Sequence, residues 1–467
     1  MEIDPVVQVT GYRYLNQQIL KENGEWGMMK RGVVMGLIFS LALSVVVLTA
    51  KPVMAVSSPE IVLDGQRLLL PAGEPGPVIS SEGRVLVPAR WIAEALGLRV
   101  SWQETTRQAV FEDAHQQTVL TIGSSTAQIG QHTVRLDSPA AVLQGRTYVP
   151  LRFVTEAFGA RVAWDPQARQ VNIESFQSLT TRLKQLFQIQ GIGLGDPAAL
   201  VVTLWGEPLE KLPSEYAFEW WIYHDNYRNY VQVGVEKDRV AALYTNGTHW
   251  ESDSGLAAGS LQTAVRQILG KPLEWIEKGQ NRYLRDGKKH SDLFLLEDIA
   301  YGEFYYDIHE NHQVTAIQVI LKQSEESMNG FLGNQRPELE KSYSRQLFLL
   351  ANALRTRMGL PAFQWNEQAA QAAEKHSRDM GVKDYFSHET PEGRTFVQRL
   401  TAEGLRFTKA GENIAANLNA INAHEALMNS PGHRANLLSD MTHLGTGSSQ
   451  GHQGTFELLH TQKFLSF

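Results

Sequence analysis

Three short blocks near the end of the chain contain histidine and glutamate, the residue types that bind metals and transfer protons. They are Phe386-Ser387-His388, Gly411-Glu412-Asn413-Ile414-Ala415 and Met428-Asn429-Ser430-Pro431-Gly432-His433-Arg434-Ala435-Asn436. If folding brings His388, Glu412 and His433 into one cleft, the two imidazoles could bind Zn²⁺ at about 2.0–2.1 Å, with water completing the shell. Two histidine ligands without a firm third make a weak site. A metal hydrolase would also need a general base, for which Glu412 is the candidate.

The alternative for these residues involves no turnover. Glu412 then orients one imidazole by a hydrogen bond and forms a rigid polar groove floor. No complete catalytic set is found elsewhere. His424-Glu425 begins like the HExxH of zinc proteases, but position 428 is methionine. The chain has no cysteine, which excludes disulfides, thiolate metal sites and a cysteine nucleophile. We therefore favour a binding role, and the alternatives are a metal-dependent extracellular hydrolase or peptidase and a purely structural spacer.

The blocks, followed by Gly445-Thr446-Gly447 and a final strand ending Thr461-Gln462-Lys463-Phe464, closely resemble a bacterial CAP (SCP/PR-1-like) domain over residues 343–467. The resemblance implies an α-β-α sandwich with a groove lined by two histidines and usually two acidic residues. By motif matching, His388 takes the first histidine place, Glu412 the first acidic place and His433 the second histidine place.

The fourth groove position departs from the pattern of animal members. Ser430 stands where they carry the second glutamate, and Leu427 stands where they carry a tryptophan three residues earlier. Glu425 is close in sequence but does not occupy the matching place. A pair of carboxylates for acid–base work is thus unsupported, and the expected ligand groove consists of His388, Glu412, Ser430 and His433.

Two amphipathic helices are expected to open this domain. Leu347, Leu350, Leu354 and Met358 share one helical face that ends at Gly359, and Asn366 is a suitable N-cap for a second helix reaching about Met380. His376 lies on that second helix with small apolar neighbours. We interpret it as a packed histidine and not as a ligand.

An internal repeat occupies residues 57–175. The segment from Gly83 to Gly97 recurs from Gly145 to Gly159, and Trp102 and Trp164 follow at the same offset. Each copy predicts a strand, a short helix that begins after a proline, and another strand. This region resembles the copper amine oxidase N-terminal-like (stalk) domain, which implies a non-catalytic wall-proximal or spacer module.

No copper is expected in this stalk region, because its histidines, His115 and His132, are isolated in the sequence. The duplicated charged residues of the two helices could bind a ligand, but we favour structural pairing for them. These residues are Arg90, Glu94, Arg152 and Glu156.

A second repeat occupies residues 180–322. Leu204-Trp205-Gly206-Glu207-Pro208-Leu209-Glu210 is echoed by Ile268-Leu269-Gly270-Lys271-Pro272-Leu273-Glu274, and each echo precedes alternating strand-like segments that predict antiparallel hairpins. The region resembles the CAP-associated N-terminal domain. Its aromatic residues could form a sugar-stacking surface, although we favour ordinary sheet core. They are Trp220, Trp221, Tyr223, Tyr227 and Tyr230.

The start of the chain predicts export. Val33 to Ala50 is apolar and uncharged, follows Lys30-Arg31, and precedes Val53-Met54-Ala55, so a signal peptide cleaved after Ala55 is expected. The alternative is a retained single-span anchor. Either topology places the rest of the chain outside the cytoplasmic membrane, secreted or associated with the cell wall.

We therefore predict an α+β multidomain protein with an upstream segment and signal peptide (1–55), two internally duplicated α+β modules (57–175 and 180–322), a polar linker (323–341) and the C-terminal sandwich (343–467). A net charge of −7 gives no basic surface for nucleic acid. The expected partner is a cell-wall or membrane-surface component. No cofactor is required, and a weak Zn²⁺ site in the groove is the only metal site considered.

Overall fold

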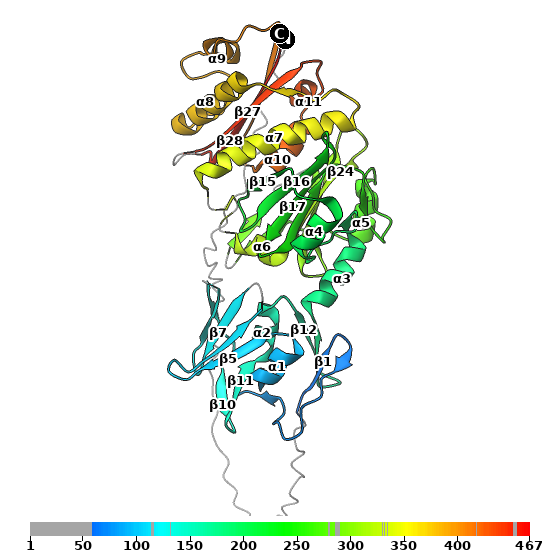
Figure 1. The fold of residues 1–467 in the computed structure, drawn as a ribbon, viewed down its shortest axis with the longest axis vertical. Helices are drawn as coiled ribbons and strands as arrows, with labels where there is room; N and C mark the ends of the chain where they lie inside the picture. Colours follow the sequence, from blue (N-terminus) through cyan, green and yellow to red (C-terminus); the bar gives the residue numbers. More distant parts are fainter. Residues whose placement is uncertain are drawn as a thin grey trace, which may run out of the picture.

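The computed structural model describes residues 58–467, except 114–115, 131, 279–280, 285–289, 329, 331, 334, 417 and 452–454. The predicted signal peptide and His115 lie outside the described residues. Three units follow one another along the long axis of the molecule, in sequence order, and the C-terminus lies at the far end from the first unit (Figure 1). In the part of the chain that is described, none of the helices has the length and apolarity needed to cross a membrane.

The first unit consists of short strands around two helices. The helices are α1 (Ala89–Ala95) and α2 (Leu151–Ala157). The strands are β1 (Glu60–Leu63), β2 (Gln66–Arg67), β3 (Val78–Ile79), β4 (Val85–Pro88), β5 (Arg99–Gln103), β6 (Gln108–Glu112), β7 (Gln117–Thr121), β8 (Thr126–Ile129), β9 (His132–Arg135), β10 (Ala141–Leu143), β11 (Arg146–Pro150), β12 (Arg161–Asp165) and β13 (Gln170–Glu174). They form sheets in the orders β12-β13-β1-β2, β10-β11-β4-β3 and β5-β6-β7-β8-β9.

The repeat predicted from the sequence is visible in this unit. Each helix begins directly after a proline, and Gly97 and Gly159 follow the helix ends with φ of 70° and 78°, a conformation that glycine adopts without strain. Strands β4 and β11 pair antiparallel and join the two copies. One feature could not be read from the repeat: β1 pairs in parallel with β13. The first strand of the unit therefore completes the sheet of the second copy.

The second unit is built on an antiparallel sheet in the order β15-β16-β17-β18-β24-β23-β22. Its strands are β14 (Gln188–Ile189), β15 (Glu210–Pro213), β16 (Glu219–Asp225), β17 (Arg228–Glu236), β18 (Arg239–Thr245), β19 (Trp250–Glu251), β20 (Trp275–Lys278), β21 (Asn281–Leu284), β22 (Ser291–Leu296), β23 (Ala300–Asp307) and β24 (Gln313–Leu321). Its helices are α3 (Phe176–Leu186), α4 (Ala198–Trp205), α5 (Gln262–Leu269) and α6 (Lys322–Ser327). The two copies of the repeat meet where β18 pairs with β24.

The third unit is the α-β-α sandwich expected from the sequence. Its helices are α7 (Pro337–Arg357), α8 (Glu367–Lys383), α9 (Phe396–Ala402), α10 (Ala420–Met428) and α11 (Pro431–Leu437), and its sheet has the order β25 (Gln364–Trp365), β27 (His443–Gln450), β28 (Leu458–Ser466), β26 (Lys409–Ala416). Successive residues of β27 face opposite sides of the sheet, so they contact different helices of the two outer layers. A side chain at Gly445 or Gly447 would overlap the backbone of α8, whereas Thr446 donates a hydrogen bond to the backbone of Ser344 on α7.

Secondary structure occupies both ends of the linker expected at residues 323–341. Helix α6 ends at Ser327 and α7 already begins at Pro337, so structured elements occupy much of this range. Glu325 is buried there because Lys278 forms an ion pair with it at 2.7 Å and Tyr216 donates a hydrogen bond to it at 2.9 Å. One charged residue of the expected linker is thus part of a buried hydrogen-bonded cluster.

The aromatic residues of the second unit form part of an interface between two domains. Trp220 and Tyr230 are each 1% exposed and belong to the same core cluster as Leu349 and Leu350 of α7 and Ile421 of α10. The preference for core over a sugar-stacking surface therefore fits these two residues, but the core they fill lies against the third unit. The sheet of the second unit and the sandwich share this apolar core.

Candidate functional site

The structure brings the carboxylate and both imidazoles of the predicted groove together at one edge of the sandwich. Glu412 lies on β26, and its Oε1 is 2.8 Å from Nδ1 of His388, which is in the connection between α8 and α9. The rings of His388 and His433 are 6.3 Å apart, with His433 on α11. The convergence assumed from the sequence is present in the structure, and the role of these residues stays a prediction.

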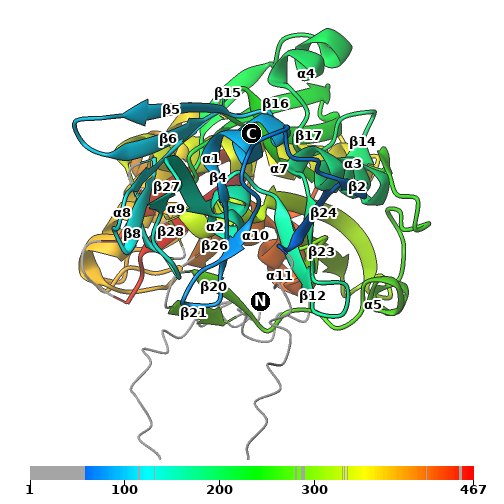
Figure 2. The same ribbon diagram turned by 90° about the horizontal axis from the view of Figure 1, so that it is seen from below.

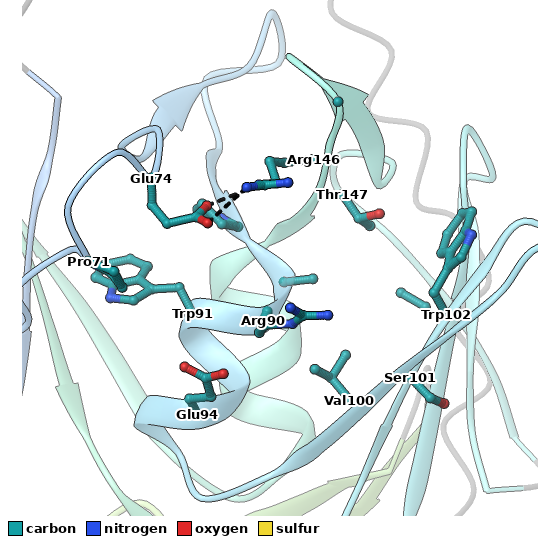
Figure 3. Close-up of a pocket in the computed structure, with 14 residues that line it drawn as sticks. Pro71, Glu74, Arg90, Trp91, Glu94, Val100, Ser101, Trp102, Arg146 and Thr147 are labelled. Carbon is teal, nitrogen blue, oxygen red and sulfur yellow. Dashed lines mark hydrogen bonds and ion pairs between the residues drawn. The ribbon is translucent and has the colours of Figure 1, made fainter.

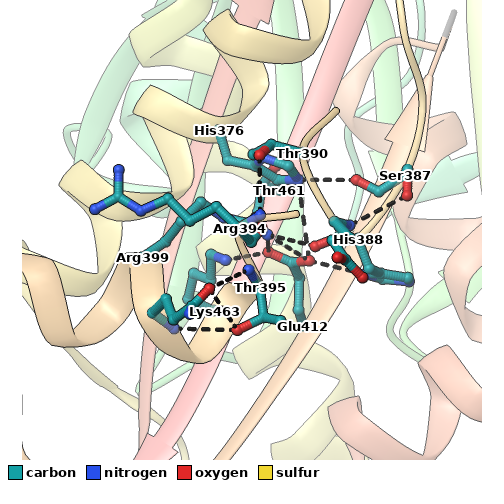
Figure 4. A network of polar contacts seen from close by, with 12 residues as sticks. His376, Ser387, His388, Thr390, Arg394, Thr395, Arg399, Glu412, Thr461 and Lys463 are labelled. Carbon is teal, nitrogen blue, oxygen red and sulfur yellow. Dashed lines mark hydrogen bonds and ion pairs between the residues drawn. The ribbon is translucent and has the colours of Figure 1, made fainter. Parts of the chain in front are cut away.

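Glu412 is held by two cations besides His388 (Figure 4). Nη2 of Arg399 on α9 donates to its two oxygens at 3.1 and 2.9 Å, and Nζ of Lys463 donates to Oε2. Lys463 is the direct partner of Glu412 in the β26–β28 register. The side chains of Glu412 and Lys463 are 1% and 0% exposed. Glu412 and Lys463 therefore form a buried ion pair that a second cation, Arg399, reinforces.

The ion pair determines the charge of the site. Burial alone would raise the pKa of Glu412, but Lys463, the hydrogen bond from His388 and the neighbouring cations outweigh it and hold that pKa well below its usual range. Burial lowers the pKa of Lys463 to about 8 although Glu412 opposes the shift. A carboxylate with so low a pKa and with both oxygens occupied is a poor general base near neutral pH. The geometry favours the orienting role for Glu412.

His376 lies behind this network, packed as the sequence predicts. It is 1% exposed, and its Nε2 is 3.1 Å from the carbonyl oxygen of Ser387 and 4.0 Å from Glu412 Oε1. The carbonyl can only accept, so Nε2 carries the proton. Burial lowers the pKa of His376 to about 3, which keeps the ring neutral. It supports the groove from within the sandwich.

Ser430 and His433 are the two remaining residues of the predicted groove, and both are buried. Ser430 is the N-cap residue of α11, and its Oγ is 2.7 Å from Nδ1 of His433. A hydroxyl thus orients this imidazole at the position where the family resemblance places a second acid. Leu427 is buried in the core of the third unit. Glu425 lies away from the groove, because it accepts a hydrogen bond from Tyr244 of the second unit.

The residues present do not make a complete zinc site. Within the described ranges, no group of three histidine, cysteine, aspartate or glutamate side chains is placed to hold a metal ion. His388 and His433 offer two imidazoles, and both oxygens of Glu412 are engaged by donors. Two ligands leave a metal weakly held.

A serine motif in this unit does not supply a nucleophile. Gly447-Ser448-Ser449-Gln450-Gly451 matches the GxSxG pattern of hydrolases, which requires a sharp turn between a strand and a helix. Ser449 lies inside the straight strand β27, is 2% exposed and donates a hydrogen bond to Glu340. The pattern here is structural.

Sequence reasoning missed Arg399 and Lys463. The signal for Lys463 was a lysine within an apolar terminal strand, which would be unfavourable unless a buried carboxylate faced it. Arg399 carried no such signal, because its position follows from the start of α9. That start is fixed by a capping box in which the side chain of Thr395 accepts from the backbone of Gln398 and the Gln398 side chain accepts from the backbone of Thr395.

Replacing Thr395 with alanine is expected to loosen the helix that carries Arg399. Loss of the N-cap should lower the free energy of local opening of α9 by about 1 kcal/mol. Hydrogen exchange of amides in residues 396–402 measures this. Thr401→Ala is the matched control, because Thr401 is exposed and bonds only within the helix. Equal exchange in the two variants would contradict the assignment of the cap.

Comparisons with known proteins match each unit separately. The copper amine oxidase N-terminal domain matches residues 62–173, the CAP-associated N-terminal domain matches residues 194–331, and the cysteine-rich secretory protein family matches residues 349–464. These matches confirm the three resemblances inferred from the sequence.

Two relatives from Bacillus subtilis (strain 168) are similar to parts of the chain. The uncharacterized membrane protein YlbC is 28% identical over 291 residues, which is 58% of this chain and 82% of YlbC. The uncharacterized protein YkwD is 34% identical over 113 residues, which is 24% of this chain and 44% of YkwD, so less than half of YkwD is matched. A crystal structure of an extracellular protein containing a SCP domain from Bacillus anthracis is 29% identical, with a TM-score of 0.51, and the match covers 59% of this chain and 94% of that protein.

Proposed function

Because residues 349–464 are a domain of the cysteine-rich secretory protein (CAP) family, we propose that this chain is an exported, envelope-associated protein whose CAP groove binds a cell-wall, lipid or protein ligand without turning it over. Two sequence features support the location: the apolar segment from Val33 to Ala50, and the likeness to a Bacillus anthracis protein described as extracellular. The ligand groove is formed by His388, Glu412, Ser430 and His433.

One observation carries the binding role. Glu412 is the acid of the groove, and its two oxygens are engaged by His388, Arg399 and Lys463. Hydrolysis requires a group that takes a proton from water near neutral pH, and a carboxylate held in this way is unsuited to that task. Glu412 gives the imidazole of His388 a fixed orientation and Ser430 does the same for His433, which is the property of a preformed recognition surface.

Binding to purified cell-wall fractions tests the proposal. Replacing His388 with alanine should weaken retention about tenfold, because 26% of this side chain is exposed and its loss removes a group that a ligand can reach. His249→Ala is the control, since His249 is exposed on the second unit. The same preparations are assayed for hydrolysis of peptidoglycan and of a peptide, with and without added Zn²⁺. Turnover that disappears in His388→Ala or His433→Ala would replace the binding proposal with a metal-dependent hydrolase.

A further inference from the structure

A pocket of about 440 Å³ lies in the first unit, far from the CAP groove, between helix α1 and the β5–β6 hairpin (Figure 3). One wall carries Arg90 and Glu94 of α1, and the hairpin supplies Val100 and Trp102. Its size falls within the range of small-molecule sites in proteins, about 300–1,000 Å³. The chain therefore contains a second place that a ligand can occupy.

Arg90 is the charged group that this pocket offers to a ligand. Its side chain is exposed, extends from α1 toward the side of the pocket with Val100 and Trp102, and forms no ion pair within the residues that the structure describes (Figure 3). The equivalent residue of the second repeat differs: Arg152 is 3.7 Å from Glu156 in an i,i+4 ion pair. Duplication has thus left one copy paired and the other with an available guanidinium. Structural pairing was expected for the arginine and glutamate of both helices, but only Arg152 and Glu156 of the second copy form such a pair among the described residues.

Of the other charges at the pocket, Arg146 and Glu74 are paired with each other. Arg146 makes a two-pronged contact with Glu74, at 3.2 Å from Nε and 3.1 Å from Nη2, and this pair closes one end of the pocket. Glu94 lies on the side of α1 near Trp91, away from Trp102 (Figure 3). A guanidinium without a counter-ion presents parallel N–H donors that can hold a carboxylate by two hydrogen bonds.

Trp102 provides an aromatic surface opposite Arg90. Its indole is 40% exposed although it is large and apolar, and its Nε1 donates a hydrogen bond to Glu104 that fixes the ring. Seen along the long axis, the β5–β6 hairpin that carries it projects to one side of the molecule (Figure 2). A rigid exposed aromatic ring beside a charged donor packs well against a ring with one apolar face and polar edges.

We propose that this pocket binds a carbohydrate that bears a carboxylate, with the sugar ring stacked on Trp102 and the carboxylate held by Arg90. The site is separate from the CAP groove and adds a second contact with an acidic glycan of the envelope. The first unit is then a binding module in addition to a spacer. Two sites on one chain would also strengthen attachment to a polymer that presents both ligands.

Calorimetric titration of the full chain with trigalacturonate tests the site, with neutral chitotriose and glycerol phosphate as comparison ligands. We expect binding of trigalacturonate that weakens with added salt, as for an ion pair near the surface. Arg90→Ala and Trp102→Ala should each weaken it about tenfold or more. Arg152→Ala and Trp164→Ala are matched controls from the second repeat, and Trp164 is 41% exposed, so its removal tests the same chemical change.

Three results would overturn the proposal. They are no binding of trigalacturonate, binding as tight for chitotriose or glycerol phosphate, or equal loss in the Arg152→Ala and Arg90→Ala variants. All four substitutions are at exposed side chains, so folding should persist, and circular dichroism checks this. His433→Ala should leave trigalacturonate binding unchanged. Failure of the CAP-groove proposal and failure of this one are therefore separate outcomes.

Discussion

Replacing Glu412 with glutamine should destabilise the CAP domain by about 3–5 kcal/mol at pH 7. The change keeps the shape of the side chain but leaves Lys463 and Arg399, 0% and 7% exposed, without their counter-charge. The glutamine amide also has only one acceptor oxygen, whereas the donors around Glu412 use both oxygens of the carboxylate. Hydrogen exchange of amides in β26–β28 follows this domain separately from the other two units.

The control for this prediction is Glu403→Gln. Glu403 also pairs with a lysine, Lys375, but that lysine is 65% exposed, so the loss should stay below about 1 kcal/mol. The double variant Glu412→Gln/Lys463→Met should be destabilised by less than the sum of its single changes, because the two residues form one unit. A loss below about 1 kcal/mol for Glu412→Gln would show that the pair contributes little, and the fixed groove floor would lose its basis.

Replacing Glu425 with glutamine should stabilise the protein more at pH 8 than at pH 4.5. The difference in free energy of unfolding between the variant and the unchanged chain should shift by about 3 kcal/mol in favour of the variant over this range. Glu425 lies on α10 and is buried against the sheet of the second unit, where it accepts a hydrogen bond from Tyr244 at 2.9 Å. Burial, opposed by Tyr244, raises the pKa of Glu425 from 4.5 to about 7.

The sign follows from proton binding. Between pH 4.5 and 7 the folded protein keeps a proton on Glu425 that the unfolded chain has lost, so this group's stabilising contribution is lost as pH rises through 7. Glutamine does not titrate and avoids that loss. Urea unfolding of both proteins at several pH values measures the difference.

Buried histidines affect both proteins equally in this comparison. His424 and His460, whose pKa values burial lowers to about 3 and about 4, stabilise the folded state as pH rises toward 6.5, and taking the difference between the proteins removes their effect. Glu338→Gln on the exposed side of α7 should show no pH-dependent difference. A flat difference for Glu425→Gln would mean that its carboxyl titrates as in water.

Much of the organisation follows from the sequence because it depends on local patterns. The helix after Pro88 and its copy after Pro150 were expected, and so were the hairpins of the second unit. Each depends on alternation, on a proline that fixes φ, or on a glycine that closes a helix, and all of these act within a few residues. The motifs containing His388, Glu412 and His433 likewise indicate the C-terminal domain from the sequence alone.

Contacts between distant segments were decided only by the tertiary structure. The facing of Lys463 and Glu412 depends on the register of β28 against β26, and the placement of Arg399 depends on where α9 packs. The burial of Trp220 against α7, the ion pair inside the expected linker and the available guanidinium of Arg90 have the same origin. In each case the surroundings of the side chain are set by residues far apart in the chain. A sequence pattern identifies the side chain but not the neighbour that folding brings to it.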